Sequence, residues 1–231
     1  MDTAKALVSM PRPPLRTPND QLAERVAEYT KLNAGGLTTV RHPGISVADY
    51  RTLEEIQKRG LLTMRVNALL RPAIGPALVE PLISGVDPDD GDEWLRVGGV
   101  KLAVDGGFEG GLMREPYEEP RGEKKTFRGL QTIDTERFIA AVRSLNRSDW
   151  RVATHAVGDA AIDLVLNAYE KANAEQSIVG RRWSIEHAFI GRADHLPRMK
   201  AMGLAVSAQN HLYLAGPSLV QYWGRARAQQ V

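Results

Sequence analysis

Short apolar runs alternate with amphipathic segments along this chain of 231 residues, and this alternation limits the possible folds more than any other feature. Strands separated by helical segments form parallel sheets joined by crossover helices. Units of roughly 30 residues fit a (β/α) barrel, which normally holds eight units in about 250 residues. Six runs read as buried strands: 37–40, 61–66, 100–104, 152–155, 183–187 and 204–208.

The predicted fold class is therefore α/β, a TIM-type (β/α) barrel that is partial, with about six βα units and without the first and last. We expect residues 1–231 to form one such partial barrel domain. The chain offers no strand before the helix predicted at Thr17 and no clear βα unit after Ala208. An open α/β sheet is the alternative for the same pattern.

Several helix starts can be recognised from their first residues. Thr17 offers a capping side chain, proline follows at the first helical position, and Asp20 places an acid in the first turn. Ser46 and Asp49 resemble a capping box before an apolar stripe. Asp159 is expected to cap the second of three further helices, predicted over 135–145, 159–172 and 194–202.

The composition is that of an ordinary globular protein, with 43% hydrophobic and 25% charged residues. The net charge of +2 is spread over the chain without an aromatic platform, so we expect no nucleic-acid partner. With no cysteine, thiolate zinc sites and a cysteine nucleophile are excluded. The sequence has no apolar run of about 20 residues and no signal-peptide pattern, so we expect no membrane partner and a cytoplasmic location.

Two loops interrupt the regular pattern. Residues 87–93 are acidic, and residues 106–129 form a long segment rich in glycine and charge after the third strand. Loops that follow strand ends build the active site of a barrel. The longer segment is therefore a candidate lid or substrate loop, with a disordered insertion as the alternative.

Two histidines and one lysine carry the strongest chemical signal. His155 and His187 each end a predicted strand, and Lys101 lies on the strand before them. Neutral imidazoles bind zinc, and catalytic zinc sites keep one position open for water. A buried lysine loses its charge readily, and the neutral amine can react with carbon dioxide to form a metal-binding carbamate. Alternatively, Lys101 extends its amine to water and the histidines are satisfied core residues.

Four motifs resemble, in order, those of amidohydrolase family 3, within the amidohydrolase superfamily. The resemblance covers roughly residues 38–221, and Asn210 stands where the family usually has proline. The motifs are Lys101–Gly107 followed by Arg114–Tyr117, Thr154–Ala161 with Ala168–Glu170, Ile185–Ala188, and Val206–His211.

The resemblance implies a metal centre at the carboxyl ends of the strands of a distorted TIM barrel. By position, Lys101 corresponds to a carbamylated bridging ligand on the fourth barrel strand, with His155 and His187 as ligands on the fifth and sixth. The metal, zinc, would lower the pKa of a bound water to about 7 and polarise the carbonyl of a small amide-type substrate. The implied activity is hydrolysis of non-peptide carbon–nitrogen bonds.

The sequence also departs from the family pattern. No H-x-H pair lies before the Thr17 helix, and the chain stops before the aspartate of the eighth strand, which serves as a ligand and general base. The chain is therefore expected to be a fragment that covers barrel strands two to seven and to hold about half of the metal site.

Other polar residues near the motifs have possible roles. Arg114, Gln209 and His211 are candidate substrate-binding residues. Asp105, with the glycine after it, is expected to shape the turn that follows its strand. Glu186 precedes a candidate ligand, so strand alternation predicts that it points away from the barrel interior.

Two further hypotheses come from other functional classes. The chain could be a catalytically inactive barrel fragment that acts as a folding or interaction module. Open strand edges near Thr38 and Leu204 would then favour self-association into a homo-oligomer. A flavodoxin-like sheet that binds a nucleotide is weaker, because residues 106–111 lack the glycine spacing of a phosphate loop.

Overall fold

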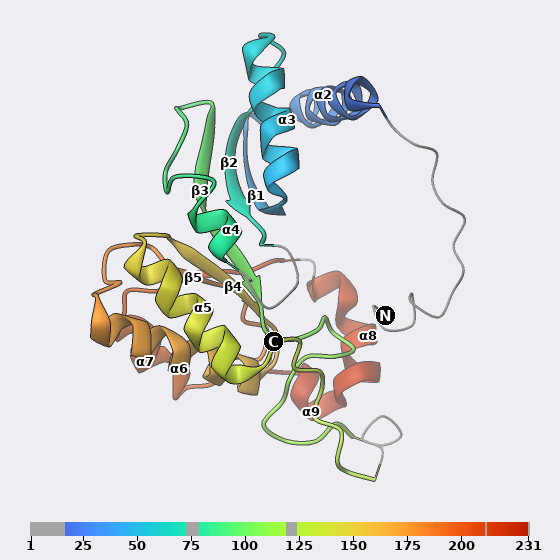
Figure 1. Ribbon diagram of the computed structural model, residues 1–231. Coiled ribbons are helices and arrows are strands. Elements are labelled where there is room, and N and C mark those ends of the chain that lie inside the picture. Colours follow the sequence, from blue (N-terminus) through green and yellow to red (C-terminus); the bar gives the residue numbers. More distant parts are fainter. Residues whose placement is uncertain (1–16, 73–78, 119–123, 211, 231) are drawn as a thin grey trace.

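The computed structural model describes residues 17–72, 79–118, 124–210 and 212–230. In these ranges, one parallel sheet of six strands follows the order of the sequence, each strand paired with the next. The predicted α/β class and partial barrel are confirmed, because the sheet is a half-barrel with flanking helices (Figure 1). The strands are β1 (Thr39–Ile45), β2 (Arg65–Leu70), β3 (Leu95–Ala103), β4 (Val152–Ala156), β5 (Ser184–His187) and β6 (Ala205–Ser207).

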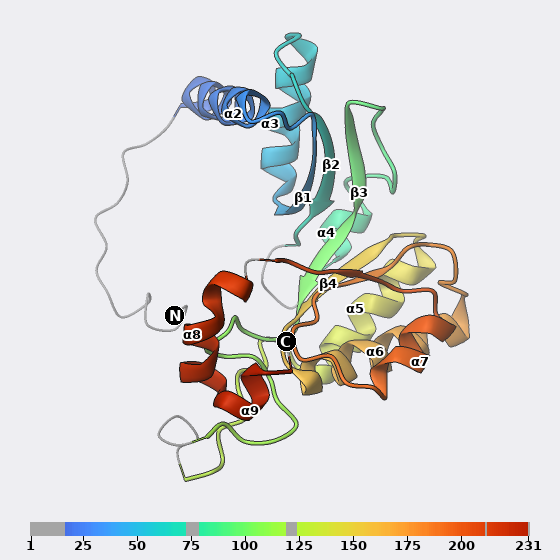
Figure 2. The same ribbon diagram turned by 180° about the vertical axis from the view of Figure 1, so that it is seen from behind.

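Helices α3 to α7 connect consecutive strands, as crossover geometry requires, whereas α2 precedes β1 and α8 and α9 follow β6. In Figures 1 and 2, α5, α6 and α7 lie together beside β4 and β5, whereas α2 and α3 lie beside β1 and β2. None of the described helices is both long enough and apolar enough to cross a membrane. The helices are α2 (Pro18–Ala34), α3 (Val47–Lys58), α4 (Glu80–Ile83), α5 (Thr135–Arg147), α6 (Asp159–Glu175), α7 (His195–Ala201), α8 (Leu212–Trp223) and α9 (Arg225–Ala228).

The predicted bounds of the first three strands are wrong: β1 was expected over 37–40 but spans Thr39–Ile45, and β3 was expected over 100–104 but spans Leu95–Ala103. The second strand was expected over 61–66 but begins at Arg65, which pairs with Thr39 of β1. The apolar run continues from Leu61 to Leu70, so composition cannot locate its start, and Leu61 is in fact exposed. Beyond β6 the described chain continues as α8 and α9, without a further strand.

The capping predictions are confirmed at two helices and wrong at a third. Thr17 and Ser46 both form complete capping boxes with the acid three residues later. At α6 the N-cap is Gly158, not Asp159. A Cβ at Gly158 would lie 1.9 Å from the carbonyl oxygen of Leu112, so only glycine fits there.

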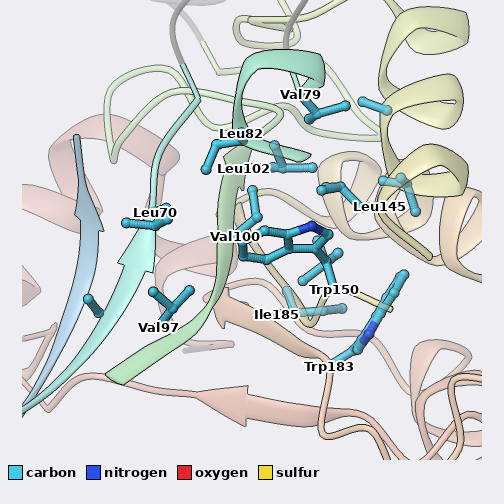
Figure 3. Packing of buried hydrophobic residues seen from close by; sticks show 14 of the residues in the cluster. Leu70, Val79, Leu82, Val97, Val100, Leu102, Leu145, Trp150, Trp183 and Ile185 are labelled. Carbon is cyan, nitrogen blue, oxygen red and sulfur yellow. The ribbon is translucent and has the colours of Figure 1, made fainter. Parts of the chain in front are cut away.

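The two faces of the sheet differ in what they contact. Alternate strand side chains face the helices, and Figure 3 shows Val100 and Ile185 among them, gathered around Trp150. Thr154 lies on the same face, because its hydroxyl is 2.8 Å from the Tyr169 hydroxyl of α6. Side chains point alternately to opposite faces of a strand, so Lys101, next to Val100, points to the concave face.

The long segment after β3 is described in 106–118 and 124–129, with 119–123 outside the described residues; part of 106–118 is buried, whereas 124–126 and 128 are exposed. Tyr117 is buried, and the Trp223 indole of α8 donates a 2.6 Å hydrogen bond to the Phe108 carbonyl. Met113, Val157 and Ile190 join them in a second apolar cluster, separate from the main core. The loop after β3 is therefore held against α8 in its described part.

The acidic loop is distant in the sheet from the strand ends that carry the histidines. Asp92 accepts hydrogen bonds from the backbone N–H groups of Trp94 and Leu95, at the start of β3. Asp89 pairs with Arg151, just before β4. Both carboxylates therefore organise the amino-terminal ends of the strands.

Candidate metal centre

Lys101 and His155 project from neighbouring strands on the concave face of the half-barrel. In the parallel register, Lys101 of β3 pairs with Ala153 of β4, and Ala103 pairs with His155. Glu186 of β5 is next to His155 in the following ladder. These pairings place the lysine one layer below the histidine, on the same face.

His187 reaches this group because its backbone breaks the strand alternation. Ile185 faces the helices, so regular alternation would turn His187 toward them as well. Instead, His187 and Ala188 have φ angles of 76° and 49°, in the left-handed region that such residues rarely adopt. The turn brings the imidazole of His187 beside that of His155, with ring centroids 4.4 Å apart.

The hydrogen bond of His155 determines which ring nitrogen is free. Its Nε2 lies 3.0 Å from the carbonyl oxygen of Gly106, which can only accept, so Nε2 carries the proton. Nδ1 therefore keeps its lone pair. Burial lowers the pKa of His155 to about 4, and the nearby Lys101 and Arg71 charges act in the same direction. The ring is neutral at physiological pH.

Lys101 has the environment expected of a lysine that loses its charge easily. Its stem packs against Gly44 of β1, where a Cβ would lie 3.3 Å from Lys101 Cγ. Burial lowers the pKa of the amine to about 8, an effect that Glu186 opposes and that the positive charges of Arg41 and Arg71 reinforce. A substantial fraction of the amine is therefore neutral near pH 8.

Glu186 does not point away from the barrel interior, and the prediction that it would is wrong. Its carboxylate accepts hydrogen bonds from Arg41 of β1 at 2.8 and 3.0 Å, and from Ser184 at 2.9 Å. Three strands separate β1 from β5, so this pair can meet only across the concave face. The prediction assumed that Glu186 and His187 face opposite sides, and the left-handed turn at His187 removes that difference.

Asp105 does more than shape a turn. Its buried carboxylate accepts hydrogen bonds from the backbone N–H groups of Leu112, Val157 and Gly158. It also lies 3.4 Å from Nε2 of His155. Burial raises its pKa to about 7 despite the backbone donors that favour the ionised form. The group ties the loop after β3 to the turn that follows β4.

Arg114 was predicted to bind substrate, but its guanidinium is engaged elsewhere. It forms 2.6 Å ion pairs with both Asp163 of α6 and Asp194, which precedes α7. Its backbone N–H donates to Asp159, whose carboxylate also binds Arg192. Substrate binding by Arg114 would require breaking two ion pairs, so the geometry favours a structural role.

Asp163, Asp194 and His195 are close enough to suggest a cation site. However, the Arg114 guanidinium already lies among them. Nδ1 of His195 accepts from the Arg192 N–H at 3.1 Å, and its Nε2 lies 2.9 Å from the Arg114 guanidinium and 3.2 Å from Asp163. Because both ring nitrogens of His195 are engaged and the permanent cation of Arg114 lies between the two carboxylates, this cluster is an ion-pair network.

Of the remaining predicted residues, Gln209 lies beside the histidines and His211 falls outside the described residues. The side-chain oxygen of Gln209 is 2.5 Å from Nδ1 of His187. The sequence analysis missed Arg41 and Arg71, which both affect the charge of Lys101. Arg71 directly follows β2, at the strand end where barrel enzymes place functional groups, and correct bounds for β2 would have identified it.

Known proteins resemble this chain in sequence and in fold. A family model described as the amidohydrolase family matches residues 2–231. A solved metal-dependent hydrolase from Pyrococcus furiosus, itself uncharacterised, is 28% identical with a TM-score of 0.79, over 94% of this chain and 44% of that one. A similar protein from Pyrococcus horikoshii gives 26% identity and a TM-score of 0.78, over 94% and 42%.

Two curated relatives match shorter stretches. Protein LONG AFTER FAR-RED 3 of Arabidopsis thaliana is 32% identical over 139 residues, which are 59% of this chain and 23% of that protein. The putative amidohydrolase YtcJ of Bacillus subtilis is 28% identical over 137 residues, 58% of this chain and 25% of that protein. The match thus spans about a quarter of these relatives and less than half of the two solved structures.

Proposed function

The chain belongs to the amidohydrolase family, and on that basis we propose that Lys101, His155 and His187 contribute about half of the metal centre of a metal-dependent hydrolase. The proposed metal is zinc, and the proposed substrates are small molecules with a non-peptide carbon–nitrogen bond of the amide type. The observation that carries the proposal is the pair of imidazoles 4.4 Å apart, brought together by strained backbone at His187. Such strain concentrates at functional sites.

The three side chains fit a divalent metal by their donor chemistry. His155 is neutral at physiological pH and has a free lone pair on Nδ1. Lys101 is partly neutral near pH 8, as carbamate formation requires. Its amine nitrogen would add to the carbon of carbon dioxide and release one proton, which yields an oxygen ligand in place of a cation. Nitrogen and oxygen donors of this kind suit zinc.

When bound, the metal would polarise the substrate carbonyl and supply a nucleophile from water at neutral pH. The chain's own residues would hold and orient this centre. Gly106 and Asp105 fix the His155 ring through Nε2, and Asp105 also anchors the loop that follows β3. Phe108 of that loop stacks on Phe189, which contacts the His187 ring, so an apolar wall borders the histidines.

The test is zinc binding by the 231-residue chain. Replacing both His155 and His187 with alanine should weaken zinc affinity by more than about 100-fold, beyond the usual effect of losing an outer-shell partner. His42→Ala is the control, because His42 is also a half-buried histidine of the sheet but lies on β1. Equilibrium dialysis with metal analysis gives the affinities. Zinc affinity that survives the double replacement would refute the assignment.

The carbamate has a separate readout. Intact-mass analysis in bicarbonate buffer with zinc should show an added carbon dioxide that is absent from the Lys101→Arg variant. Lys31→Arg, on the exposed surface of α2, is the matched control and should leave the added mass in place. An added mass that persists in Lys101→Arg would place the modification on another amine.

A further inference from the structure

A cavity of about 170 Å³ lies on the concave face of the sheet, on the amino-terminal side of the candidate metal centre. Two of its lining residues, Ala153 and Ser184, precede His155 and Glu186 by two positions on β4 and β5, so they point to the same face. Branched side chains normally fill each level of a barrel interior. Here small side chains leave space for several waters or for one small oxyanion.

An asparagine amide forms part of the cavity wall. Asn67 of β2 packs on Gly98, where a Cβ would lie 1.5 Å from the side-chain oxygen of Asn67, so only glycine fits there. This oxygen is buried and has no hydrogen-bond partner among the described residues. Buried polar atoms nearly always have a partner, which can be a water or an ion. The amide oxygen therefore requires a donor from outside the described chain.

Three arginines also line the cavity, and none of its described lining residues is acidic. Arg41 pairs with Glu186, and Arg151 pairs with Asp89. The side chain of Arg182 forms neither an ion pair nor a hydrogen bond with another residue in the described part of the chain. The cavity wall therefore carries one positive charge that its neighbouring carboxylates do not balance.

These groups indicate the chemistry of a ligand. A guanidinium donates through a planar fork that fits two oxygens of an oxyanion. The Asn67 amide presents a donor and an acceptor side by side, so it fits a group that carries an oxygen acceptor and a hydroxyl next to each other. Bicarbonate and hydrogen phosphate carry both on one central atom. Sulfate has no hydrogen at neutral pH and offers acceptors alone.

We propose that this cavity binds a small oxyanion that bears a hydroxyl group, of the bicarbonate or hydrogen phosphate type. In this site Arg182 balances the negative charge of the ligand, and the ligand's hydroxyl donates to the Asn67 oxygen. The cavity is lined by none of the proposed metal ligands, so this inference goes beyond the proposed function and does not depend on it.

The experiment titrates the metal-free chain with inorganic phosphate, bicarbonate and sulfate at neutral pH and constant ionic strength. Chemical shifts in ¹H–¹⁵N correlation spectra report binding. We expect saturable shifts centred on the Asn67 amide and the backbone of Ala153, with sulfate producing them more weakly. Phosphate and bicarbonate should bind about 10-fold more tightly than sulfate, the effect of one further hydrogen bond to a charged group.

Two variants test the location of the site. Arg182→Gln keeps a side-chain donor but removes the charge, and should weaken phosphate binding about 10-fold. Arg137→Gln is the matched control, because Arg137 is an exposed arginine on α5, and it should leave the affinity unchanged. Ala153→Leu fills the cavity with a larger side chain and should abolish phosphate binding. Circular dichroism verifies folding, and Arg182→Gln decides the question if Ala153→Leu does not fold.

Each contrary result contradicts a defined part of the proposal. Shifts that do not saturate with phosphate or bicarbonate would show that the cavity is not an anion site. Equal affinities for phosphate and sulfate would exclude the role of the hydroxyl at Asn67. Phosphate affinity that is the same in Arg182→Gln as in Arg137→Gln would place the anion elsewhere. Zinc binding is measured separately through His155 and His187, so failure of one proposal leaves the other intact.

Discussion

At the scale of single residues, backbone and hydrogen bonds decide what each histidine can do. His155 and His187 use different ring nitrogens, because Nε2 of His155 contacts the Gly106 carbonyl whereas Nδ1 of His187 contacts the Gln209 side chain. Both ring nitrogens of His195 are engaged, Nδ1 by the Arg192 backbone N–H and Nε2 by Arg114 and Asp163. Three histidines of the same chain are thus suited to different tasks by contacts that their local sequence does not reveal.

His195 also predicts a dependence of stability on pH. Its side chain is fully buried, and burial lowers its pKa below the ordinary 6.5. The unfolded chain therefore binds the proton first as the pH falls, and stability is lost below the unfolded pKa. From pH 7.5 to 5.5 we expect each such histidine to cost up to about 1.4 kcal/mol of unfolding free energy.

Urea unfolding of the metal-free chain at both pH values measures this loss. His155 and His42, whose pKa values are also lowered, contribute in the same direction. The His195→Gln variant should be less stable than wild type at pH 7.5 but lose less on acidification. If wild type and variant lose the same unfolding free energy on acidification, His195 does not titrate between pH 7.5 and 5.5.

At the scale of elements, the helices depend on partners from neighbouring elements as well as on their own ends. Asn146 of α5 is fully buried and donates hydrogen bonds of 2.8 Å to the carbonyls of Ala172 and Gln176, at the end of α6. Its side-chain oxygen accepts from Arg181 at 2.6 Å. The Asn146 side chain therefore supplies hydrogen-bond donors to backbone carbonyls at the end of α6. It also positions Arg181, in the segment that leads into β5.

Asn146→Leu should lower the free energy of unfolding by about 2–3 kcal/mol, because buried carbonyls that lose their donors retain their desolvation cost. Urea denaturation gives the value. Asn167→Ala is the control: this exposed asparagine of α6 accepts a hydrogen bond from Arg198 at the surface, and its loss should change stability by no more than about 0.5 kcal/mol. Equal effects of the two variants would contradict the capping role.

At the scale of the whole molecule, curvature of the sheet brings the site together. Neighbouring strands lie about 4.8 Å apart, so a flat sheet would separate β1 from β5 by roughly 19 Å. Arg41 and Glu186 nevertheless form a 2.8 Å ion pair, which requires the sheet to curl. The pair therefore ties the first strand to the fifth across the concave face. β1 and β6 form the two edges of the sheet.

Removing this tie should destabilise the half-barrel. Arg41→Met leaves the carboxylate of Glu186, 3% exposed, without its strongest donor, and should cost about 2 kcal/mol of unfolding free energy, typical of a hydrogen bond to a charged group. Arg25→Met breaks an exposed ion pair with Glu28 within α2 and should cost less than about 1 kcal/mol. Urea denaturation compares the two. If Arg41→Met lowers the free energy of unfolding by no more than Arg25→Met does, the ion pair between Arg41 and Glu186 contributes little to stability.

Local patterns in the chain were sufficient for the strand–helix order and the capping boxes at Thr17 and Ser46, whereas the ligand roles of Lys101, His155 and His187 come from the family resemblance and stay a prediction. These features depend on residues only a few positions apart, and at that range the hydrophobic period, the helix caps and short motifs can be recognised in the sequence. The start of β2 and the direction of Glu186 were not predictable in this way. The first depends on pairing with β1, and the second on a positive φ at His187 that no local pattern signals. Contacts across the concave face, such as the ion pair between Arg41 and Glu186, form only when strands that are distant in the sequence come together in the curved sheet.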